Sequence, residues 1–387
     1  MFMKTYYLSI WQKAAMVFLS CWMFFSESIV YAQTDLVQIL NTTQSDFNKL
    51  MDGYYKPISK AAGTAMNHGW HNVAEPMRVG RFDVRIVTSA TFTPEQDQTL
   101  DLNALELSNS FLFDPESSTT AGLLSSNQGS TVRYFPQGVD TDNNSPALLT
   151  LPDGVGFNFA PVPAVQFNLG LLWGTELSIR FAPPLAFDNN QDILDNSEGK
   201  TKIGLWGVGL KHDFQQWIPG FNLWPVKFSL AMGFSHANIK SNTALTPTDT
   251  TLVLQGVSAK PDYSNFTNQQ LNFTVDAFHA GLLFSRKFPI ITFYGGLWFQ
   301  TSSTRFEILG NYPITIQDND PNSLTFGDTV IAEITDPYTV THSFRQASFN
   351  LGVRLKLGVF SLFVDYATGT QDYNTLSTGI GFGLYEN

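Results

Sequence analysis

The sequence has 387 residues, a net charge of −11, and 43% hydrophobic, 14% charged and 14% aromatic residues. The hydrophobic fraction excludes a disordered chain, and an acidic sequence without a cluster of Lys and Arg argues against nucleic-acid binding. Few charges together with 33 phenylalanines suit a protein whose outer surface is apolar.

The first residues have the pattern of a cleaved signal peptide. Basic residues precede an apolar run over residues 14–25, and the small residue Ala32 closes the segment. The run is shorter than the roughly 20 residues of a membrane-spanning helix. It also continues past Cys21, which argues against a lipoprotein. We expect residues 1–32 to be removed on export, which leaves no thiol for disulfides, nucleophilic catalysis or metal binding.

Residues 33–78 differ in pattern from the rest of the chain. Apolar residues recur at helical spacing over residues 36–40, and a second short helix is predicted to begin at Pro57 and to stop before Gly69. We interpret residues 33–78 as a small helical N-terminal segment.

From residue 79 onward, segments of alternating polarity replace the helical pattern. Phe82, Val84 and Ile86 alternate with Asp83 and Arg85. Successive side chains of a strand point to opposite faces, so such a segment has one apolar and one polar face. The same alternation recurs in segments that begin at Leu205, Lys227, Phe349 and Gly379.

A soluble β-sandwich and a membrane β-barrel both show this alternation, but strand length and connections favour the barrel. Several segments reach the about 9 to 11 residues of a tilted transmembrane strand. Short connections at Trp173-Gly174, residues 286–289 and Gly358 contrast with long polar ones. The long connections lie around Asn143, Asn189, Asn242 and Asn319. Short turns opposite long loops are typical of outer-membrane barrels, so residues 79–387 are predicted to form an antiparallel transmembrane barrel of about 14 strands, within a range of about 12 to 16.

Several short segments also resemble motifs of an uncharacterised family of predicted Gram-negative outer-membrane β-barrels. They are residues 55–57, 67–70, 82–84, 206–213 and 216–220. The resemblance implies a bacterial outer-membrane location and no known activity. An N-terminal plug before about fourteen strands is also similar in architecture to the FadL-like transporters of hydrophobic compounds, an analogy that carries no ligand residues over.

Strand parity places a set of charged residues on the polar face, which in a barrel lines the lumen. They are Arg81, Asp83, Arg85, Arg180, Lys202, Lys211, Asp213, Lys227, Asp276, Arg345, Arg354, Lys356 and Asp365. They either select what passes through the lumen or form pairs between wall and plug. We favour the pairs, because no spacing among them defines a single ligand pocket.

Glycines on the lumen face suggest where the N-terminal segment packs. They are Gly207, Gly209, Gly379, Gly381 and Gly383. A strand face without side chains lets another segment approach closely, although glycines can also simply ease curvature. We expect the segment with Tyr55, Pro57, Asn67 and Trp70 to lie inside the barrel as a plug.

Catalytic and metal-binding patterns are weak. His68 and His71 lack a nearby carboxylate, so a structural role is favoured over a metal site. His212 and Asp213 are adjacent in a strand and therefore face opposite ways. The acidic loops lack calcium-loop spacing, and tryptophans near strand ends suit interfacial anchoring. We expect no metal, no cofactor and no enzymatic activity.

Two functions remain. The first is a channel or transporter for small molecules, hydrophobic ones among them, through a partly plugged barrel. The second is a non-transporting barrel that docks a periplasmic or secretion partner through Lys211, Asp213, Trp217, Lys287 and Phe288. Either protein would contact outer-membrane lipid and lipopolysaccharide, and the first would also bind a small hydrophobic ligand.

Overall fold

The computed structural model describes residues 42–112, 118–135, 146–188, 200–242, 268–317, 321–324, 326–327 and 329–383. The expected signal peptide, the helical spacing at 36–40 and the loop positions Asn143, Asn189 and Asn319 lie outside these residues.

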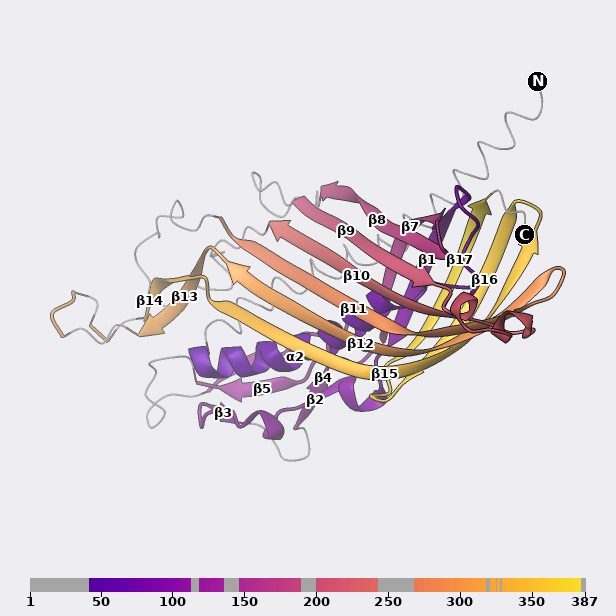
Figure 1. The fold of residues 1–387 in the computed structure, drawn as a ribbon. Helices are drawn as coiled ribbons and strands as arrows, with labels where there is room; N and C mark the ends of the chain where they lie inside the picture. The colour runs from indigo at the N-terminus through magenta and orange to yellow at the C-terminus, as the bar shows by residue number, and fades with distance from the viewer. Residues whose placement is uncertain are drawn as a thin grey trace, which may run out of the picture.

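In the described part of the chain, ten antiparallel strands close into a barrel (Figure 1). They are β1 (Phe82–Phe92), β7 (Phe159–Leu171), β8 (Thr175–Asp188), β9 (Lys200–His212), β10 (Lys227–Asn242), β11 (Gln270–Lys287), β12 (Ile291–Leu309), β15 (Tyr338–Leu357), β16 (Phe360–Gly369) and β17 (Asn374–Gly383). Pairing of β1 with both β7 and β17 completes the circle, so the sheet closes on itself. The predicted barrel class is confirmed.

The predicted count of about fourteen strands is not confirmed, because several strands of the chain lie outside the wall. A hairpin of β13 (Asn311–Gln317) and β14 (Thr329–Thr335) extends beyond the barrel. Small sheets between β1 and β7 contain β2 (Thr99–Asp101), β3 (Phe111–Leu112), β4 (Thr119–Ala121), β5 (Thr131–Tyr134) and β6 (Ala147–Thr150). Sequence alternation does not distinguish these strands from those of the wall.

The two ends of the barrel differ in their connections. One end, called the short-turn end, holds the β7–β8, β11–β12 and β15–β16 turns that the sequence predicted. In the first of these turns, Trp173 and Gly174 have φ of 56° and 62°, as a tight hairpin turn with the twist of its strands requires. The β9–β10 connection at the same end contains η4 (Gln215–Trp217) and η5 (Phe221–Leu223). The opposite end, called the long-loop end, holds the β1–β7, β8–β9, β10–β11 and β12–β15 connections.

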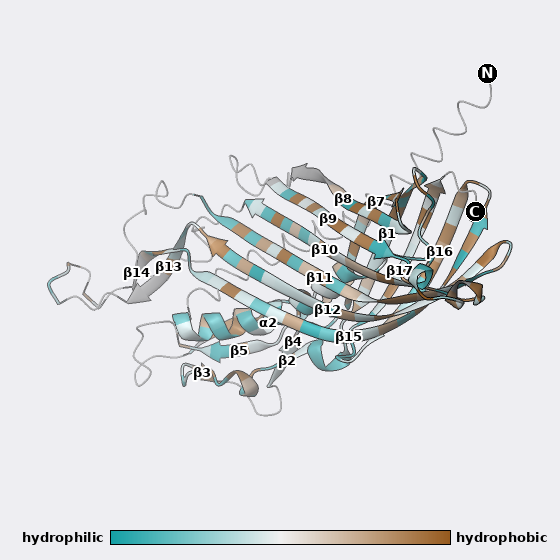
Figure 2. Ribbon diagram, viewed as in Figure 1, coloured by the Kyte–Doolittle hydropathy of each residue, from teal (hydrophilic) through white to brown (hydrophobic). Residues whose placement is uncertain are grey.

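The outer face of the wall is apolar only in the half near the short-turn end (Figure 2). On β12, Phe293, Leu297 and Phe299 are more than half exposed, while the intervening Tyr294 and Trp298 are buried. Further along β12, the outer positions become Thr301, Ser303 and Arg305. An apolar band therefore surrounds the short-turn half of the barrel. From this band toward the other end, called upward below, the outer wall is polar.

The α-helix of the described residues, α2 (Gln44–Asn67), contacts β1, β7, β10, β11, β12 and β15 and so lies within the barrel. Thr43 caps its first turn by accepting a hydrogen bond from the Asp46 backbone N–H at 3.2 Å. The prediction of a helix that begins at Pro57 is wrong, because α2 runs through this buried proline. Its end before Gly69 is confirmed. Contacts of α2 with the surrounding wall offset the about 3 kcal/mol that an internal proline costs. No helix of the described residues is long and apolar enough to cross a membrane.

The insertion between β1 and β7, residues 93–158, is called the cap. Its Leu102 and Leu149 share one buried core with Leu50 of α2 and with Ile308 and Tyr312 near the end of β12. The cap also includes η1 (Glu95–Asp97) and η2 (Asn103–Leu105). Lys60 of α2 forms an ion pair of 2.8 Å with Asp97 of η1. The cap and the first half of α2 are thus packed as one unit at the long-loop end.

Candidate site inside the barrel

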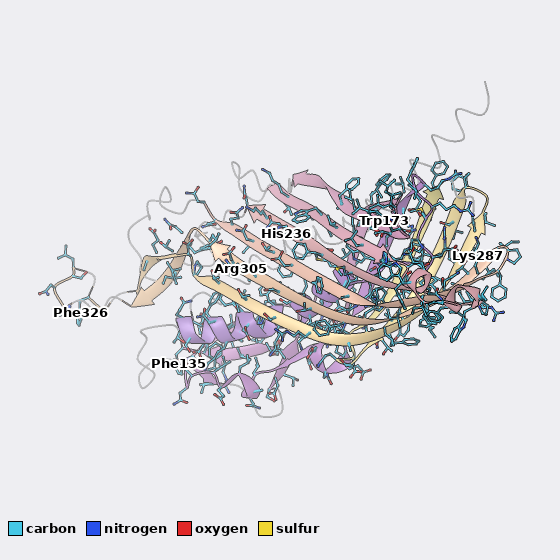
Figure 3. The ribbon with its side chains drawn as sticks, viewed as in Figure 1. Phe135, Trp173, His236, Lys287, Arg305 and Phe326 are labelled. Atoms are coloured by element: carbon cyan, nitrogen blue, oxygen red, sulfur yellow. The ribbon has the colours of Figure 1, made fainter. Side chains whose placement is uncertain are left out.

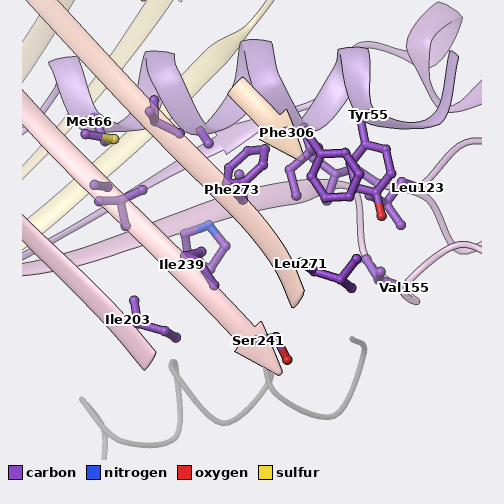
Figure 4. A pocket seen from close by; sticks show the side chains of 18 of the residues that line it. Tyr55, Met66, Leu123, Val155, Ile203, Ile239, Ser241, Leu271, Phe273 and Phe306 are labelled. Atoms are coloured by element: carbon purple, nitrogen blue, oxygen red, sulfur yellow. The ribbon is translucent and has the colours of Figure 1, made fainter. Parts of the chain in front are cut away.

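An apolar cavity of about 200 Å³ lies between α2, the cap and the inner wall (Figure 4). One face of the helix contributes Met51, Tyr55, Ile58, Ala62 and Met66, which recur at the spacing that aligns side chains on one side of a helix. The wall side is lined by Val162, Ile203, Ile239, Phe273 and Phe306, and the cap adds Leu123 and Val155.

The lining offers almost no polar contact. Tyr55 stacks on Phe306 with ring centroids 3.6 Å apart, and burial raises the pKa of its hydroxyl, which therefore stays neutral. The Ser241 hydroxyl is engaged with Thr201 at 2.9 Å. No charged side chain is among the described residues that line the cavity. The cavity is therefore suited to an uncharged apolar molecule.

The wall next to this cavity has an interrupted hydrogen-bond ladder. Pairing of β7 with β8 runs only from Leu171↔Thr175 to Val165↔Phe181. Beyond it, β7 continues beside β1, whereas β8 continues beside β9 through a register shift between Ala182 and Leu185.

Prolines lie on both edges of the interruption. On β7, Pro161 and Pro163 come just beyond the last β7–β8 pair, and Pro183 and Pro184 come just beyond it on β8. None of these residues has an N–H to donate. Pro161 and Pro163 also line the cavity. The cavity thus borders a wall contact of the described barrel where strand pairing stops short.

The short-turn half of the interior is filled by residues 68–77, called the plug segment. Arg180 donates hydrogen bonds to the His68 carbonyl at 3.0 Å and to Gln166 Oε1 at 2.9 Å, and its guanidinium lies 4.1 Å from the centre of the Trp70 ring. Gln166 in turn donates to the Trp70 carbonyl at 2.8 Å. Side chains of the wall therefore fix the backbone of the plug segment directly.

Lys211 of β9 binds the backbone of the plug segment further along in the same way. Its ammonium donates to the Val73 carbonyl at 2.9 Å and lies 3.0 Å from Glu176, while the Met77 N–H donates to the same Glu176 oxygen at 3.0 Å. Ala74 is held at both backbone groups, because its N–H donates to Ser285 and its carbonyl accepts from Ser229. The lysine and glutamate are nearly fully buried, so each depends on the other for charge compensation.

Three buried histidines surround Trp70. Gln300 donates to His68, and burial, with the nearby Arg180 charge, lowers the pKa of His68 to about 4. Burial also lowers the pKa of His71, which lies 6.1 Å from His279 between ring centres. Among the described residues, neither His71 nor His279 has a hydrogen-bond partner for its ring nitrogens. No group of three or more possible metal-ligating side chains is found in the described ranges.

The structure places the predicted lumen residues in four environments. Those buried in the interior are Asp83, Arg85, Arg180, Lys211, Arg354 and Asp365. Arg85 pairs with Asp83 at 2.7 Å, and Tyr294 donates to Asp365 at 2.8 Å. Half-buried at the short-turn end are Arg81, Lys227 and Lys356.

Four predicted lumen residues lie elsewhere. Asp213 follows the end of β9 and accepts a hydrogen bond from the Gln215 N–H, so it supports the turn before η4 instead of lining the interior. Asp276 lies on the outer face, where it binds His236 at 2.8 Å. Lys202 and Arg345 are likewise exposed on the outer face. Each of these three has the parity of outward apolar residues of its own strand, such as Trp206, Phe278 and Leu351. Their charge misled the assignment, because the outer wall itself becomes polar above the apolar band.

The predicted plug residues are all inside the barrel. Tyr55 and Pro57 lie on α2, and Asn67 at its end donates to the Thr301 carbonyl at 3.2 Å. Trp70 packs on the bare backbone of Gly207 and Gly209, where an added Cβ would meet its ring at 3.0 and 2.9 Å.

The glycines of β17 have different neighbours. Gly379 is covered by Phe363, and Gly381 lies against Ser361 and Arg85. At these two glycines, wall side chains fill the space, and the plug segment approaches β17 at Ser377 instead, where Gly69 lies against it.

Sequence reasoning missed Glu176, His279 and the entire apolar cavity. Glu176 has the same strand parity as Arg180 on β8, so the sequence already placed this carboxylate on the inner face of the barrel. A carboxylate buried there needs a charged partner. The cavity gave no such signal, because its lining residues are apolar side chains on the inner face of a barrel, where polar ones are expected.

Comparison with known proteins gives a family match and remote structural likenesses. Residues 9–384 match a family described as "Family of unknown function (DUF6588)". No curated protein matches the chain. Among solved structures, Ail of Yersinia pestis is 9% identical, with 54% of this chain and 97% of that chain covered and a TM-score of 0.22.

Two larger proteins are similarly remote. The translocator domain of autotransporter NalP from Neisseria meningitidis is 11% identical, with 80% and 89% covered and a TM-score of 0.30. The Ralstonia pickettii toluene transporter TbuX is 8% identical, with 86% and 98% covered and a TM-score of 0.26. Likenesses this low carry no argument about activity, which has to come from the geometry of the chain itself.

Proposed function

The chain belongs to this family of unknown function, and we propose that it is an outer-membrane barrel that takes up a small, uncharged, apolar molecule. The apolar band supports the membrane placement. On β12 it covers residues 291–299, which fits the about 9 to 11 residues of a tilted transmembrane strand. A closed sheet satisfies its backbone hydrogen bonds internally, as hydrocarbon surroundings require.

The connections support an orientation. Short turns of outer-membrane barrels lie in the periplasm and long loops lie outside the cell. Trp173, labelled in Figure 3, is 79% exposed at the short-turn end, and Trp217 of the β9–β10 connection is 69% exposed. Such exposure suits rings at a headgroup layer. The cap and the apolar cavity then belong to the external half of the barrel.

The cavity is the observation that carries the proposed ligand class. Its uncharged apolar lining disfavours a carboxylate or an ammonium group, because a buried charge without a partner is costly. A one- or two-ring aromatic hydrocarbon or a short alkane matches its size and chemistry.

The interrupted β7–β8 pairing supports a route between the cavity and the surroundings of the barrel. Local separation of these strands breaks few hydrogen bonds, since the prolines leave few to break. The short-turn half of the interior offers no comparable route, because the plug segment there is hydrogen-bonded to the wall.

Binding of naphthalene and of its carboxylate analogue, naphthoate, to the purified protein tests the ligand class. We expect naphthalene to bind at least about tenfold more tightly, since burial of an unpaired charge costs several kcal/mol. Ile239→Trp should abolish binding by filling the cavity, and the milder Ala237→Leu should weaken it. Ile380→Trp, the same change on the outer face, is the matched control. Equal binding of both compounds, or full binding by Ile239→Trp, would contradict the proposal.

A non-transporting barrel is the second candidate, and the bonded plug segment favours it. A docking surface at the short-turn end could use Trp217 and Phe288, which are exposed, but not Lys211, which is buried. Naphthalene uptake by cells that carry the protein in their outer membrane separates the two. A transporter raises uptake and loses the effect with Ile239→Trp, whereas a docking barrel leaves uptake unchanged.

A further inference from the structure

Two lysines face each other on the outer wall above the apolar band. Lys202 of β9 and Lys240 of β10 are direct partners in the antiparallel register, and both side chains are exposed. Like charges directly opposite each other on one sheet face destabilise the pairing. An anion bound between them would remove this repulsion.

Two neighbouring carboxylates on the outer wall lie beside other cations, and a third, Asp188 of β8, stands opposite Lys200 in the register. Asp276 binds His236 at 2.8 Å, and Glu307 lies 3.9 Å from Arg305. The next residue across the sheet from Lys240 is the neutral Asn272. Within the described residues, neither Lys202 nor Lys240 has an ion-pair partner. The pair therefore presents two adjacent positive charges to the surroundings.

The position of the pair relative to the apolar band indicates the kind of anion. Trp206, half exposed, is the last large apolar side chain on the outer face of β9, and it lies beside His236. Lys202 lies four residues further along the strand, about 10 Å above Trp206 for a strand rise of about 3.3 Å and a tilt of about 40°. Lysine side chains reach toward a membrane interface along their apolar stems.

We propose that Lys202 and Lys240 clamp a phosphate group of a lipid in the outer leaflet. The ammonium groups supply charge-assisted hydrogen bonds to phosphate oxygens, while the apolar band below them contacts the acyl chains of the same lipid. The inference rests on the proposed membrane placement, but not on the ligand of the internal cavity. Its effect is to fix the depth of the barrel wall on the β9–β10 side.

Binding of defined lipids to the full chain in detergent micelles, followed by native mass spectrometry, tests this clamp. The probes are a diphosphorylated lipid A, the same glycolipid without phosphate, and inorganic phosphate. We expect the phosphorylated lipid to bind at least about tenfold more tightly than the dephosphorylated one, from charge-assisted hydrogen bonds. The variant with Lys202→Gln and Lys240→Gln should lose this preference, and the variant with Lys202→Arg and Lys240→Arg should retain it.

Lys287→Gln is the matched control, because Lys287 is an exposed lysine at the opposite end of the barrel. It should leave the preference unchanged. Three results would overturn the clamp: no preference in the unaltered protein, a preserved preference in the double Gln variant, or full competition by inorganic phosphate at the same concentration. Naphthalene binding by each variant reports on the cavity separately, so failure of the clamp and failure of the proposed function are distinguishable.

Discussion

In the long-loop half of the barrel, called the apolar half, α2 packs on the wall through apolar side chains and leaves a cavity. In the short-turn half, called the polar half, charged and amide side chains of the wall form hydrogen bonds with the backbone of the plug segment. Apolar packing is not directional, so it tolerates small shifts and a guest molecule. A buried hydrogen bond or ion pair requires both partners in place. Changes in the polar half should therefore cost more stability than changes around the cavity.

The largest expected effect comes from removal of Glu176. Glu176→Ala leaves Lys211 buried without its partner, which should lower the free energy of unfolding by about 3–5 kcal/mol. Urea unfolding of the protein in micelles measures it. Replacement of both residues by apolar ones, with Glu176→Leu and Lys211→Met, should cost far less. A loss below about 1 kcal/mol for Glu176→Ala would show that the pair does not hold the plug segment.

The second-largest loss of stability should come from acid, which acts on the polar half. The pKa of His68 is about 4 in the folded chain, below its usual 6.5. The unfolded chain therefore binds the proton first, and stability falls as the pH drops from about 6.5 to about 4 and then levels off. At about 1.4 kcal/mol per pKa unit, this one group accounts for about 3 kcal/mol.

Unfolding free energies at pH 7 and pH 4.5 measure this acid effect. His68→Gln should make the dependence shallower, and His71, whose pKa is also lowered by burial, should keep part of it. An identical pH dependence in His68→Gln would assign the acid effect to other groups.

The contact of Trp70 with the glycines should give an intermediate effect. Gly209→Val places atoms where the Trp70 ring lies, and overpacking of this kind costs about 1–3 kcal/mol. Tryptophan fluorescence and unfolding in micelles report the displacement. Gly204→Ala is the control, because its added Cβ meets nothing within 4 Å. Equal stability of both variants would argue against close packing of the plug segment on β9.

The smallest effect is expected at the cavity. Ala237→Val adds two methyl groups to the lining and should change the free energy of unfolding by less than about 1 kcal/mol, because empty space accepts them. Naphthalene binding should weaken in the same variant. A large destabilisation would mean that the apolar half is packed as tightly as the polar half.

The sequence predicted the wall better than the interior. Alternation placed Phe82 and Val84 outside and Asp83 and Arg85 inside, because period-2 burial follows directly from strand geometry. The charge of Asp276 misled this assignment, since polarity identifies the inner face only where lipid or an apolar band covers the outer one. Alternation also could not separate the strands of the cap from those of the wall.

Helix prediction failed for a related reason. A proline is a common first residue of a helix, but Pro57 sits inside α2, where packing in the barrel offsets the lost hydrogen bond. The buried Glu176–Lys211 pair joins β8 to β9, and the cavity joins residues from α2, the cap and five strands. Such sites depend on closure of the barrel, which a linear pattern does not encode.

The placement of the apolar band in lipid is the claim on which the account depends most, and spin labels along β12 test it directly. Single cysteines at Phe293, Leu297, Ser303 and Arg305, in a chain with Cys21→Ser, would be labelled and reconstituted in bilayers. We predict that labels at 293 and 297 collide with oxygen and are shielded from a water-soluble nickel complex, and that labels at 303 and 305 show the reverse. Equal access of the nickel complex to all four positions would contradict the account.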